Sequence, residues 1–483
     1  MLLCSCGGGG GAVDAPTEFT LTQTTPRDEA EDIPLVSEIN LVFSHAVDPA
    51  SLTADSFRVV VESGDTIPGN RLIPPLNRSL ARFLPQSGFL PFAIHTVRVT
   101  REVRDTTGRP LDREYTFEFQ TEPSGPVLPD QSQVEDLGNL LKVGRWFHRM
   151  TLLPSNRFLI TGGYAADNGL TGFAENLVPA LRQSFLIPAT MVQPRAGHVQ
   201  VPLLDGRLLI AGGEVSNVPF VPIAACEIFD PATFRFEVAA SMGAARSFAS
   251  AVRLSDGRVL VSGGQSLGPG GAFLFRDDAE IYDPVAGTWT PAAGPMAARR
   301  SHHGSFLLAS TDVLVMGGTP GRPSAELWDP FSGSFAPLIG QGTFDHYLGA
   351  ATTLPDGRPF MAGGLNSLGV SMFDPSFGFV GAINTMFGSR AFATATALRD
   401  GRVFLAGGTD FGAVPALLHE TIDVFFPIGQ TGKILRVPGV RLPVPTSHHA
   451  AALDPDGNLW LVGGLPTASF LPGLRQVTVL HPG

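Results

Sequence analysis

Arginine and histidine recur at two fixed distances from a repeated pair of glycines. The slot 17 residues before the first glycine holds arginine in five copies, at Arg145, Arg195, Arg246, Arg300 and Arg390, and it holds His346 and Thr446 in the other two. Three residues after this slot stand His148, His198, His303 and His449. Guanidinium groups bind carboxylates and sulfates through paired hydrogen bonds. A ring of these side chains would therefore bind an acidic peptide or an acidic glycan.

The same register also has a structural explanation. A residue that repeats with the fold usually serves the fold, and each Arg and His would then bond backbone carbonyls of its own repeat or the next one. The residue types leave both interpretations open. The candidate ligand-binding set is Arg145, His148, Arg195, His198, Arg246, Arg300, His303, His346, Arg390 and His449. We expect no catalytic residue, resident metal or cofactor.

The glycine pairs define a repeat that occurs seven times. They stand at Gly162-Gly163, Gly212-Gly213, Gly263-Gly264, Gly317-Gly318, Gly363-Gly364, Gly407-Gly408 and Gly463-Gly464. A period of about 50 residues is typical of repeat arrays. Asp-Gly precedes the pair by seven residues in five copies, as at Asp256-Gly257. It predicts a two-residue hairpin loop in which both residues take positive φ.

A second strand follows each pair, as in Ala279-Glu280-Ile281-Tyr282-Asp283-Pro284, and an aromatic residue such as Trp289 follows five residues after the proline. The glycine pair, the aromatic at Tyr282 and Trp289 resemble the kelch repeat. The resemblance covers residues 134–483 and implies an all-β, seven-bladed β-propeller like the central domain of galactose oxidase. Loops after the glycine pairs would open on one face, which is the expected binding surface.

The last repeat lacks a fourth strand at the carboxyl end of the chain. Leu141 precedes Arg145 by four residues, as Met191 precedes Arg195. We therefore predict that Val134 to about Leu141 supplies the missing strand and pairs beside Val477–Leu480. Such pairing would leave no open sheet edge in the ring.

The region before the repeats is expected to form a β-sandwich followed by a linker. Residues 16–122 hold runs that alternate polar and apolar with period two, such as Ser37-Glu38-Ile39-Asn40-Leu41-Val42-Phe43. Phe43 to Leu52 and Asp105 to Leu111 resemble bacterial Ig-like domains, which serve as spacers or adhesion modules. Residues 123–133 are rich in proline and are expected to be a semi-rigid linker.

Residues 1–15 combine two cysteines with a run of glycines. Leu3-Cys4-Ser5-Cys6 resembles the end of a bacterial lipoprotein signal, with Cys6 as the acylated residue and the glycines as a tether. The alternative is an accidental cysteine-rich amino terminus, since no charged or long apolar region precedes the motif. The lipoprotein interpretation predicts an extracytoplasmic protein, either anchored in the cell envelope or secreted.

Charge and hydropathy exclude several partner classes. The net charge of −11 argues against nucleic acid, because phosphate binding needs clustered cations. No apolar run approaches the ~18–20 residues of a membrane-spanning helix. We expect a monomer that reaches a membrane only through a lipid anchor and that binds a protein or a glycan.

An enzymatic alternative follows from the same resemblance. Copper-radical oxidases such as galactose oxidase need two Tyr, two His and a Cys linked to one Tyr. Tyr115 falls in the other domain, and Tyr282 and Cys226 fill repeated structural positions, which leaves Tyr164 and Tyr347. Copper is therefore not expected. We expect a non-catalytic binding or scaffold protein, and the alternative is a carbohydrate-active or oxidative enzyme of the galactose-oxidase-like class.

Overall fold

The computed structural model divides the chain into two units, Met1–Pro126 and Val127–Gly483. It describes residues 18–482 except 34–36, 62–64, 75–76, 86–88, 90–92, 122–131, 166–168, 320–324, 339–344, 375–378, 429–430 and 467–472. Cys6 and most of the predicted linker, residues 123–133, lie outside the described residues. The described helices are three short 3₁₀ turns, η1 (Pro49–Ser51), η3 (Pro179–Leu181) and η4 (Pro269–Gly271).

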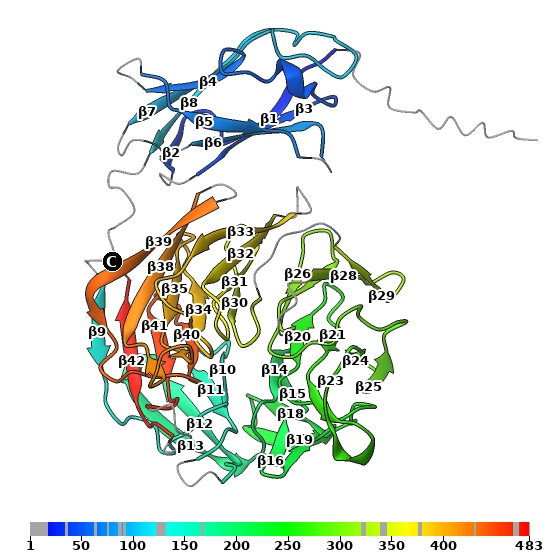
Figure 1. Cartoon of the computed structure of the whole chain (residues 1–483), viewed down its shortest axis with the longest axis vertical. Helices are drawn as coiled ribbons and strands as arrows, with labels where there is room; N and C mark the ends of the chain where they lie inside the picture. Colours follow the sequence, from blue (N-terminus) through cyan, green and yellow to red (C-terminus); the bar gives the residue numbers. More distant parts are fainter. Residues whose placement is uncertain are drawn as a thin grey trace, which may run out of the picture. The chain divides into compact units, whose positions relative to one another are not determined.

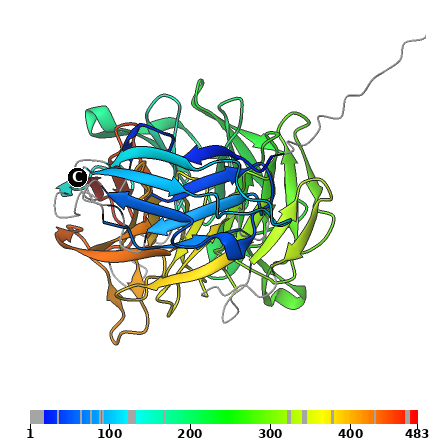
Figure 2. The same ribbon diagram turned by 90° about the horizontal axis from the view of Figure 1, so that it is seen from above.

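The first unit contains two four-stranded sheets, whose strands appear in blue in Figure 2. One sheet has the order β1 (Leu21–Thr25), β3 (Ile39–Phe43), β6 (Leu80–Pro85), β5 (Gly69–Leu72). The other has the order β2 (Ala30–Ile33), β8 (Tyr115–Thr121), β7 (Ile94–Val99), β4 (Phe57–Val61). Alternate residues of β3 and β4 are buried in one shared core. The predicted period of two is therefore confirmed.

The second unit contains seven four-stranded antiparallel sheets among its described residues. In chain order, the first four are sheet 1, β10 (Arg149–Leu152), β11 (Phe158–Thr161), β12 (Phe173–Val178), β13 (Gln183–Thr190); sheet 2, β14 (Val199–Pro202), β15 (Leu208–Ala211), β18 (Cys226–Asp230), β19 (Arg235–Ala239); sheet 3, β20 (Ser250–Arg253), β21 (Val259–Ser262), β24 (Ala279–Asp283), β25 (Thr288–Pro291); and sheet 4, β26 (Gly304–Leu307), β27 (Val313–Met316), β28 (Ala325–Asp329), β29 (Ser334–Pro337). The others are sheet 5, β30 (Ala350–Thr353), β31 (Pro359–Ala362), β32 (Gly369–Asp374), β33 (Phe379–Thr385); sheet 6, β34 (Thr394–Ala397), β35 (Val403–Ala406), β38 (Thr421–Ile428), β39 (Thr431–Arg441); and sheet 7, β40 (Ala450–Leu453), β41 (Leu459–Val462), β42 (Val477–His481), β9 (Gln133–Asp136).

Hydrophobic faces hold neighbouring sheets together. The second strand of each sheet is short, apolar and buried along its whole length, as in β15. Leu209 and Ala211 of sheet 2 pack in one cluster with Val259 and Val261 of sheet 3. The cluster of Phe158 joins sheet 1 to Trp460 of sheet 7 in the same way. Burial of apolar area on both faces is thus the main stabilising contribution.

The succession of sheets returns to its start. The first strand of each sheet lies against the first strand of the next, and β40 of sheet 7 lies against β10 of sheet 1. The amide of Gly163 donates to the carbonyl of Arg195 in the following sheet at 2.9 Å, and the amide of Gly464 donates to Arg145 at 2.9 Å. Sheet 7 therefore contacts sheet 1 by the same bond that joins sheet 1 to sheet 2.

The predicted pairing of a strand from before the first repeat with the last strand of the chain is confirmed. Strand β9 pairs antiparallel with β42, with Val134 opposite Leu480 and Gln133 opposite His481, and Figure 1 shows the cyan β9 beside the red β42. The strand is shorter than the predicted 134–141. It ends at Asp136, and the chain turns at Gly138, where φ is +63°.

The Asp-Gly hairpins differ from the prediction of a two-residue loop with two positive φ angles. The Leu203 amide donates to the Arg207 carbonyl at 2.8 Å, and three residues lie between them. Only Gly206 takes a positive φ, +86°, while Asp205 accepts the Arg207 amide on its side chain. This is the three-residue loop with a left-handed glycine. The prediction was wrong because Asp-Gly is compatible with both loops.

Two sheets have no glycine at this left-handed position. Asn156 has φ +58° in sheet 1, and Thr311 has φ +77° in sheet 4. A β-branched residue in this region is strained. We expect Thr311→Gly to raise the free energy of unfolding by about 1 kcal/mol in urea titrations. The reverse change, Gly206→Thr, should lower it by a similar amount, and an unchanged or lower stability of Thr311→Gly would contradict the assignment of strain.

Candidate functional site

The seven residues of the predicted arginine slot bond the carbonyl of the glycine 17 positions later. Nη1 of Arg195 donates to the Gly212 carbonyl at 2.8 Å. Arg145, Arg246, Arg300 and Arg390 donate to Gly162, Gly263, Gly317 and Gly407 at 2.8 to 2.9 Å. Nδ1 of His346 lies 2.9 Å from the Gly363 carbonyl, and Oγ1 of Thr446 lies 3.4 Å from that of Gly463. The slot therefore attaches the start of each sheet to the end of its second strand.

Each slot arginine also pairs with an acidic residue on the third strand of its own sheet. Nη2 of Arg195 lies 2.6 Å from Oε1 of Glu227, and both side chains are at most 1% exposed. The Glu227 carboxylate accepts two further bonds from the amides of Val192 and Gln193. The other pairs are Arg145–Glu175, Arg246–Glu280, Arg300–Glu326 and Arg390–Asp423.

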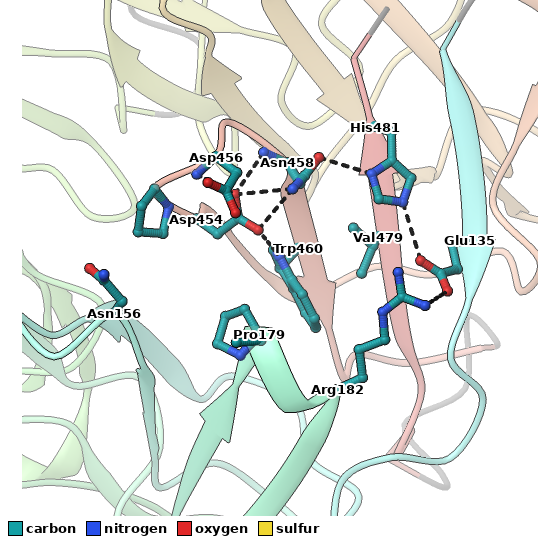
Figure 3. Close-up of a pocket in the computed structure, with 12 residues that line it drawn as sticks. Glu135, Asn156, Pro179, Arg182, Asp454, Asp456, Asn458, Trp460, Val479 and His481 are labelled. Atoms are coloured by element: carbon teal, nitrogen blue, oxygen red, sulfur yellow. Dashed lines mark hydrogen bonds and ion pairs between the residues drawn. The ribbon is translucent and has the colours of Figure 1, made fainter.

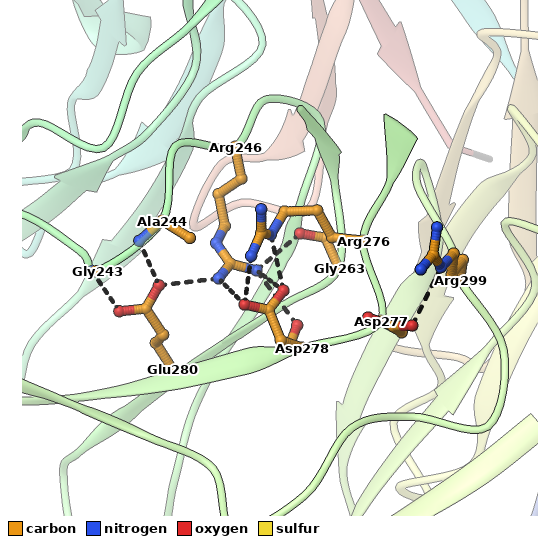
Figure 4. A network of polar contacts seen from close by, with 9 residues as sticks. All are labelled: Gly243, Ala244, Arg246, Gly263, Arg276, Asp277, Asp278, Glu280 and Arg299. Atoms are coloured by element: carbon orange, nitrogen blue, oxygen red, sulfur yellow. Dashed lines mark hydrogen bonds and ion pairs between the residues drawn. The ribbon is translucent and has the colours of Figure 1, made fainter. Parts of the chain in front are cut away.

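The Arg246 pair extends into a larger network, shown in Figure 4. Arg246 contacts Asp278 as well as Glu280. Asp278 in turn accepts two bonds from Arg276, at 2.7 and 2.6 Å. Asp278 is partly exposed, but the guanidinium of Arg246 is fully buried.

These contacts match the structural explanation of the arginine register. Burial lowers the pKa of Arg145, Arg195, Arg300 and Arg390, and the adjacent carboxylates oppose that shift. The guanidinium groups are engaged by their own sheets and do not line the cavities described below. Binding of an acidic ligand by the arginines stays a prediction that these contacts do not favour.

The histidine slot forms contacts between sheets. His198 of sheet 2 lies with Nε2 2.9 Å from Oγ1 of Thr161 in sheet 1, and a Cβ on Gly162 would come within 2.8 Å of its ring. His303 contacts Ser262 and His449 contacts Thr394 at the same 2.9 Å. The ring of His148 lies against Gly463 of sheet 7. At Gly162, Gly263, Gly407 and Gly463 a side chain would collide with one of these rings and, more closely, with a backbone carbonyl of the following slot residue, so glycine is required there.

Burial keeps these histidines neutral. It lowers the pKa of His148, His198 and His303 well below the usual value and lowers that of His346 and His449 to about 4. His148, His303 and His449 line a cavity of about 220 Å³ beside the first strands. A ligand role for these histidines therefore stays a prediction.

Two residues after the arginine slot, the chain takes a left-handed conformation in all seven sheets. These residues are Phe147, Gly197, Phe248, His302, Leu348, Phe392 and His448, with φ between +50° and +64°. Six of the seven neighbouring pairs in this series are joined by a backbone bond that runs in the same direction, as where Phe248 donates to Gly197, His302 to Phe248, and Phe147 to His448. We call them the axial ring. The sequence analysis missed it, since only one of the seven is glycine.

The side chains of the axial ring form an aromatic cluster. Phe392 and His448 stack with ring centroids 3.8 Å apart, and Phe248 and His302 stack at 4.4 Å. Phe147 contacts Phe248 at 4.7 Å. Five members of the axial ring line both the cavity beside the first strands and a second cavity that also touches the loops after the glycine pairs: Phe147, Phe248, His302, Leu348 and Phe392.

This second cavity, the aromatic cavity, has a volume of about 260 Å³. Its lining is Trp146, Phe147, Tyr164, Glu214, Asn217, Phe220, Phe248, Gln265, His302, Tyr347, Leu348 and Phe392. Asn217 and Phe220 belong to the hairpin β16 (Glu214–Asn217) and β17 (Phe220–Pro222), and Gln265 begins the hairpin β22 (Gln265–Leu267) and β23 (Phe273–Phe275). A third hairpin, β36 (Thr409–Asp410) and β37 (Leu417–Leu418), follows the pair of sheet 6. An apolar cavity with a few polar groups is the usual form of a small-ligand site.

One acidic group in the aromatic cavity is strongly perturbed. Glu214 is 3% exposed, and burial raises its pKa to about 7, against the opposing effects of the Tyr164 and Ser247 hydroxyls. The Tyr164 hydroxyl donates to Oε1 of Glu214 at 2.7 Å, and burial together with this carboxylate raises the pKa of Tyr164. Burial lowers the pKa of His302 to about 3. Perturbed groups in a cavity mark a candidate functional site.

The sequence analysis named the loops after the glycine pairs but not these residues. Tyr164, Glu214 and Gln265 each follow the second glycine of a pair directly. Each bridges the residue after the arginine slot, as Tyr164 bridges Trp146. The sequence did carry one signal for these residues. The position directly after the second glycine is fixed in the repeat but varies in residue type, whereas a position that serves only the fold would hold the same residue type in each repeat.

A further cavity lies at the seam between sheets 7 and 1 and is shown in Figure 3. It has a volume of about 360 Å³. Glu135 pairs with Arg182 and His481, and Asp454 accepts bonds from Asn458 and from the Trp460 indole at 2.9 Å. The Arg182–Glu135 pair crosses the seam and the other bonds lie within sheet 7, so these polar groups already satisfy one another, which indicates a structural role.

Comparison with known proteins identifies the first unit. The family model of the bacterial Ig-like domain matches residues 15–121. The first unit is a bacterial Ig-like domain. The Ig-like resemblance drawn from the sequence is thereby confirmed, and the model match and the sandwich topology agree.

The search of curated proteins finds no match. Among solved structures, one that is similar, with a TM-score of 0.55, is a fungal enzyme in complex with copper. It is described as a novel alcohol oxidase with catalytic diversity among the AA5 family. The identity is 18%, and the match covers 72% of this chain and 76% of that chain. At this identity the likeness shows a shared fold alone.

The residues of the aromatic cavity do not fit the copper-radical site that the resemblance implies. Cys226 lies buried in β18 beside Leu209 and Val259, with Sγ 3.3 Å from the Ala224 carbonyl, and it does not line the cavity. Among the residues that the structure describes, no three His, Cys, Asp or Glu side chains are grouped as metal ligands. In the same residues, no helix has the length and hydropathy of a membrane span.

Proposed function

We propose that residues 134–483 form a seven-bladed β-propeller of the kelch type, in which the seven sheets are the blades and the axial ring surrounds the axis. The circuit of first strands and the bond from Gly464 to Arg145 support this proposal. The pairing of β9 with β42 supports it as well, since it completes the seventh sheet.

The function that the geometry supports best is non-catalytic binding of a small ligand, or of a small group on a glycan or protein, in the aromatic cavity. The observation that carries it is the convergence of buried aromatic rings with Glu214, Tyr164 and Gln265 from three consecutive sheets. Volumes of ~300–1,000 Å³ are usual for drug-sized ligands. The smaller aromatic cavity therefore suits one chemical group and not a long chain.

The Ig-like domain supports a location outside the cytoplasm. Domains of this type are typical of bacterial surface proteins, and we propose that it acts as a spacer for the propeller. Acylation of Cys6 is part of the same proposal. Mass spectrometry of the native amino terminus would test it, and a Cys6 without lipid would contradict it.

The alternative, an oxidative or carbohydrate-active enzyme, rests on the shared fold with the AA5 structure. It predicts bound copper and oxidation of an alcohol or sugar by the purified chain. Elemental analysis together with a peroxide assay over a panel of sugars separates the two functions.

The binding function is tested with Tyr347, a half-buried residue at the cavity edge. We expect a glycan and small-amine panel on the full chain to yield a ligand whose affinity falls at least about tenfold in Tyr347→Ala, because the ring supplies contact area. Leu204→Ala, 68% exposed in a hairpin loop of sheet 2, should bind normally. Ligands that bind both variants equally would contradict a site in this cavity.

A further inference from the structure

The aromatic cavity has an unusual charge balance. Among its described lining residues there is no arginine or lysine. The slot arginines of the three sheets that supply Tyr164, Glu214 and Gln265 pair with carboxylates of their own sheets. Glu214 is the one carboxylic acid of the lining, and Tyr164, Tyr347 and His302 are the other titratable groups. Any charge in the cavity is therefore negative near neutral pH.

One oxygen of the Glu214 carboxylate is available to a ligand. Oε1 accepts the Tyr164 hydroxyl, whereas Oε2 is buried and accepts no bond of normal hydrogen-bond geometry within the described part of the chain, although the buried Ser247 hydroxyl lies near enough to lower the pKa of Glu214. A buried carboxylate oxygen without a donor is costly, and a bound donor or cation would remove that cost. Because this oxygen belongs to a residue that lines an accessible cavity, it is evidence that the cavity binds a ligand.

The walls of the cavity are aromatic on several sides. Trp146 stacks on Tyr164 with centroids 4.7 Å apart, and Phe248 stacks on His302. Phe220 and Tyr347 come from two further loops. Aromatic faces attract cations, most strongly when water is excluded, and cages of such rings recognise alkylated ammonium groups.

We propose that the aromatic cavity binds a small organic cation of the alkylammonium class, with Glu214 as the counter-ion and the aromatic rings as the walls. The inference rests on the proposed function, since it names the ligand class of that site. An acidic ligand would meet the Glu214 carboxylate and no cation. A neutral sugar hydroxyl would also donate to Oε2, but it carries no positive charge and would lack the ion pair and the cation–π attraction that an ammonium group gains.

Choline and its uncharged analogue 3,3-dimethylbutan-1-ol form a matched pair of probes, because they differ in charge and little in shape. We expect the full chain to bind choline, followed by calorimetry, and to bind the alcohol at least about tenfold more weakly. Glu214→Gln should reduce choline affinity at least about tenfold and leave the alcohol unchanged. Moving the carboxylate within the cavity, in Glu214→Gln combined with Gln265→Glu, should restore part of the choline affinity.

The affinity of the unmodified chain for choline should also depend on pH. The free cavity holds Glu214 with a pKa of about 7, so the carboxylate is protonated in mildly acidic solution and cannot pair with the cation. Affinity should rise as the pH increases through 7, and it should be roughly eightfold to 30-fold lower at pH 5.5 than on the plateau, depending on how weakly the protonated form binds. Binding of the uncharged alcohol should show no such rise.

Equal affinity for choline and the alcohol, or choline binding that is independent of both pH and Glu214, would overturn the inference. A neutral glycan that binds in a Tyr347-dependent manner while choline does not would overturn the cation class and leave the proposed function standing. A ligand that ignores Tyr347 altogether would remove the proposed function itself.

Discussion

Replacing Arg195 with methionine is expected to lower the free energy of unfolding by about 3–5 kcal/mol, because the change leaves the Glu227 carboxylate buried without its counter-ion. Both side chains of the pair are at most 1% exposed, and Arg195 also bonds the Gly212 carbonyl. Urea unfolding of the full chain, followed by tryptophan fluorescence, measures the loss.

Two further variants isolate the buried charge as the cause. Arg195→Met combined with Glu227→Met removes both charges and should recover much of the lost stability, since a buried pair contributes little net free energy. Arg207→Met acts on an exposed pair in the same sheet and should change the stability by less than about 0.5 kcal/mol. A single Arg195→Met variant as stable as the unmodified chain would show that the pair does not hold the sheet.

Prolines in place of both Val134 and Glu135 are expected to detach the strand that completes sheet 7. Consecutive residues direct their amides to opposite sides of a strand, so one of the two prolines must remove a bond from β9 to β42. We expect a loss of about 3 kcal/mol, from the broken ladder and the uncovered β42 edge. Aggregation should accompany it, because an open edge pairs with other chains.

The control for this variant carries alanine at both positions. It loses the same side-chain contacts, including those of Glu135 with Arg182 and His481, but keeps the backbone donors. The alanine variant should remain monomeric in light scattering and lose less stability than the proline variant. If the two variants behave alike, the backbone pairing of β9 does not stabilise the unit.

Local signals explain why much of the architecture could be predicted. The period of two in Ile39–Phe43 and the short apolar runs before each glycine pair depend on neighbouring residues only, and burial of those residues confirms them. The partner of β42 was also predictable, because the spacing of Leu141 and Arg145 repeats that of Met191 and Arg195. A repeat supplies its own template, so a missing strand can be assigned by register.

Contacts between distant residues explain what could not be predicted. The arginine register was recognised, but the partners of the arginine side chains were not. Glu227 lies 32 positions after Arg195, and no spacing rule links the two residues. The hairpin type was predicted incorrectly because the Asp-Gly dipeptide is compatible with both the two-residue and the three-residue loop. The left-handed Phe147, Phe248 and Phe392 carry no glycine signal, and contacts among rings from distant parts of the chain, as between Phe147 and Phe248, accompany that conformation.

From the order of its residues alone, this chain specifies an all-β protein with a bacterial Ig-like region followed by seven repeats, because strand pattern and turn chemistry act over a few positions. Only the folded arrangement decides that the arginines face their own carboxylates and that Tyr164, Glu214 and Gln265 share one cavity. The physical reason is that burial and pairing depend on which strands become neighbours, and strands far apart in the chain, such as those of the first and seventh sheets, come into contact only on folding.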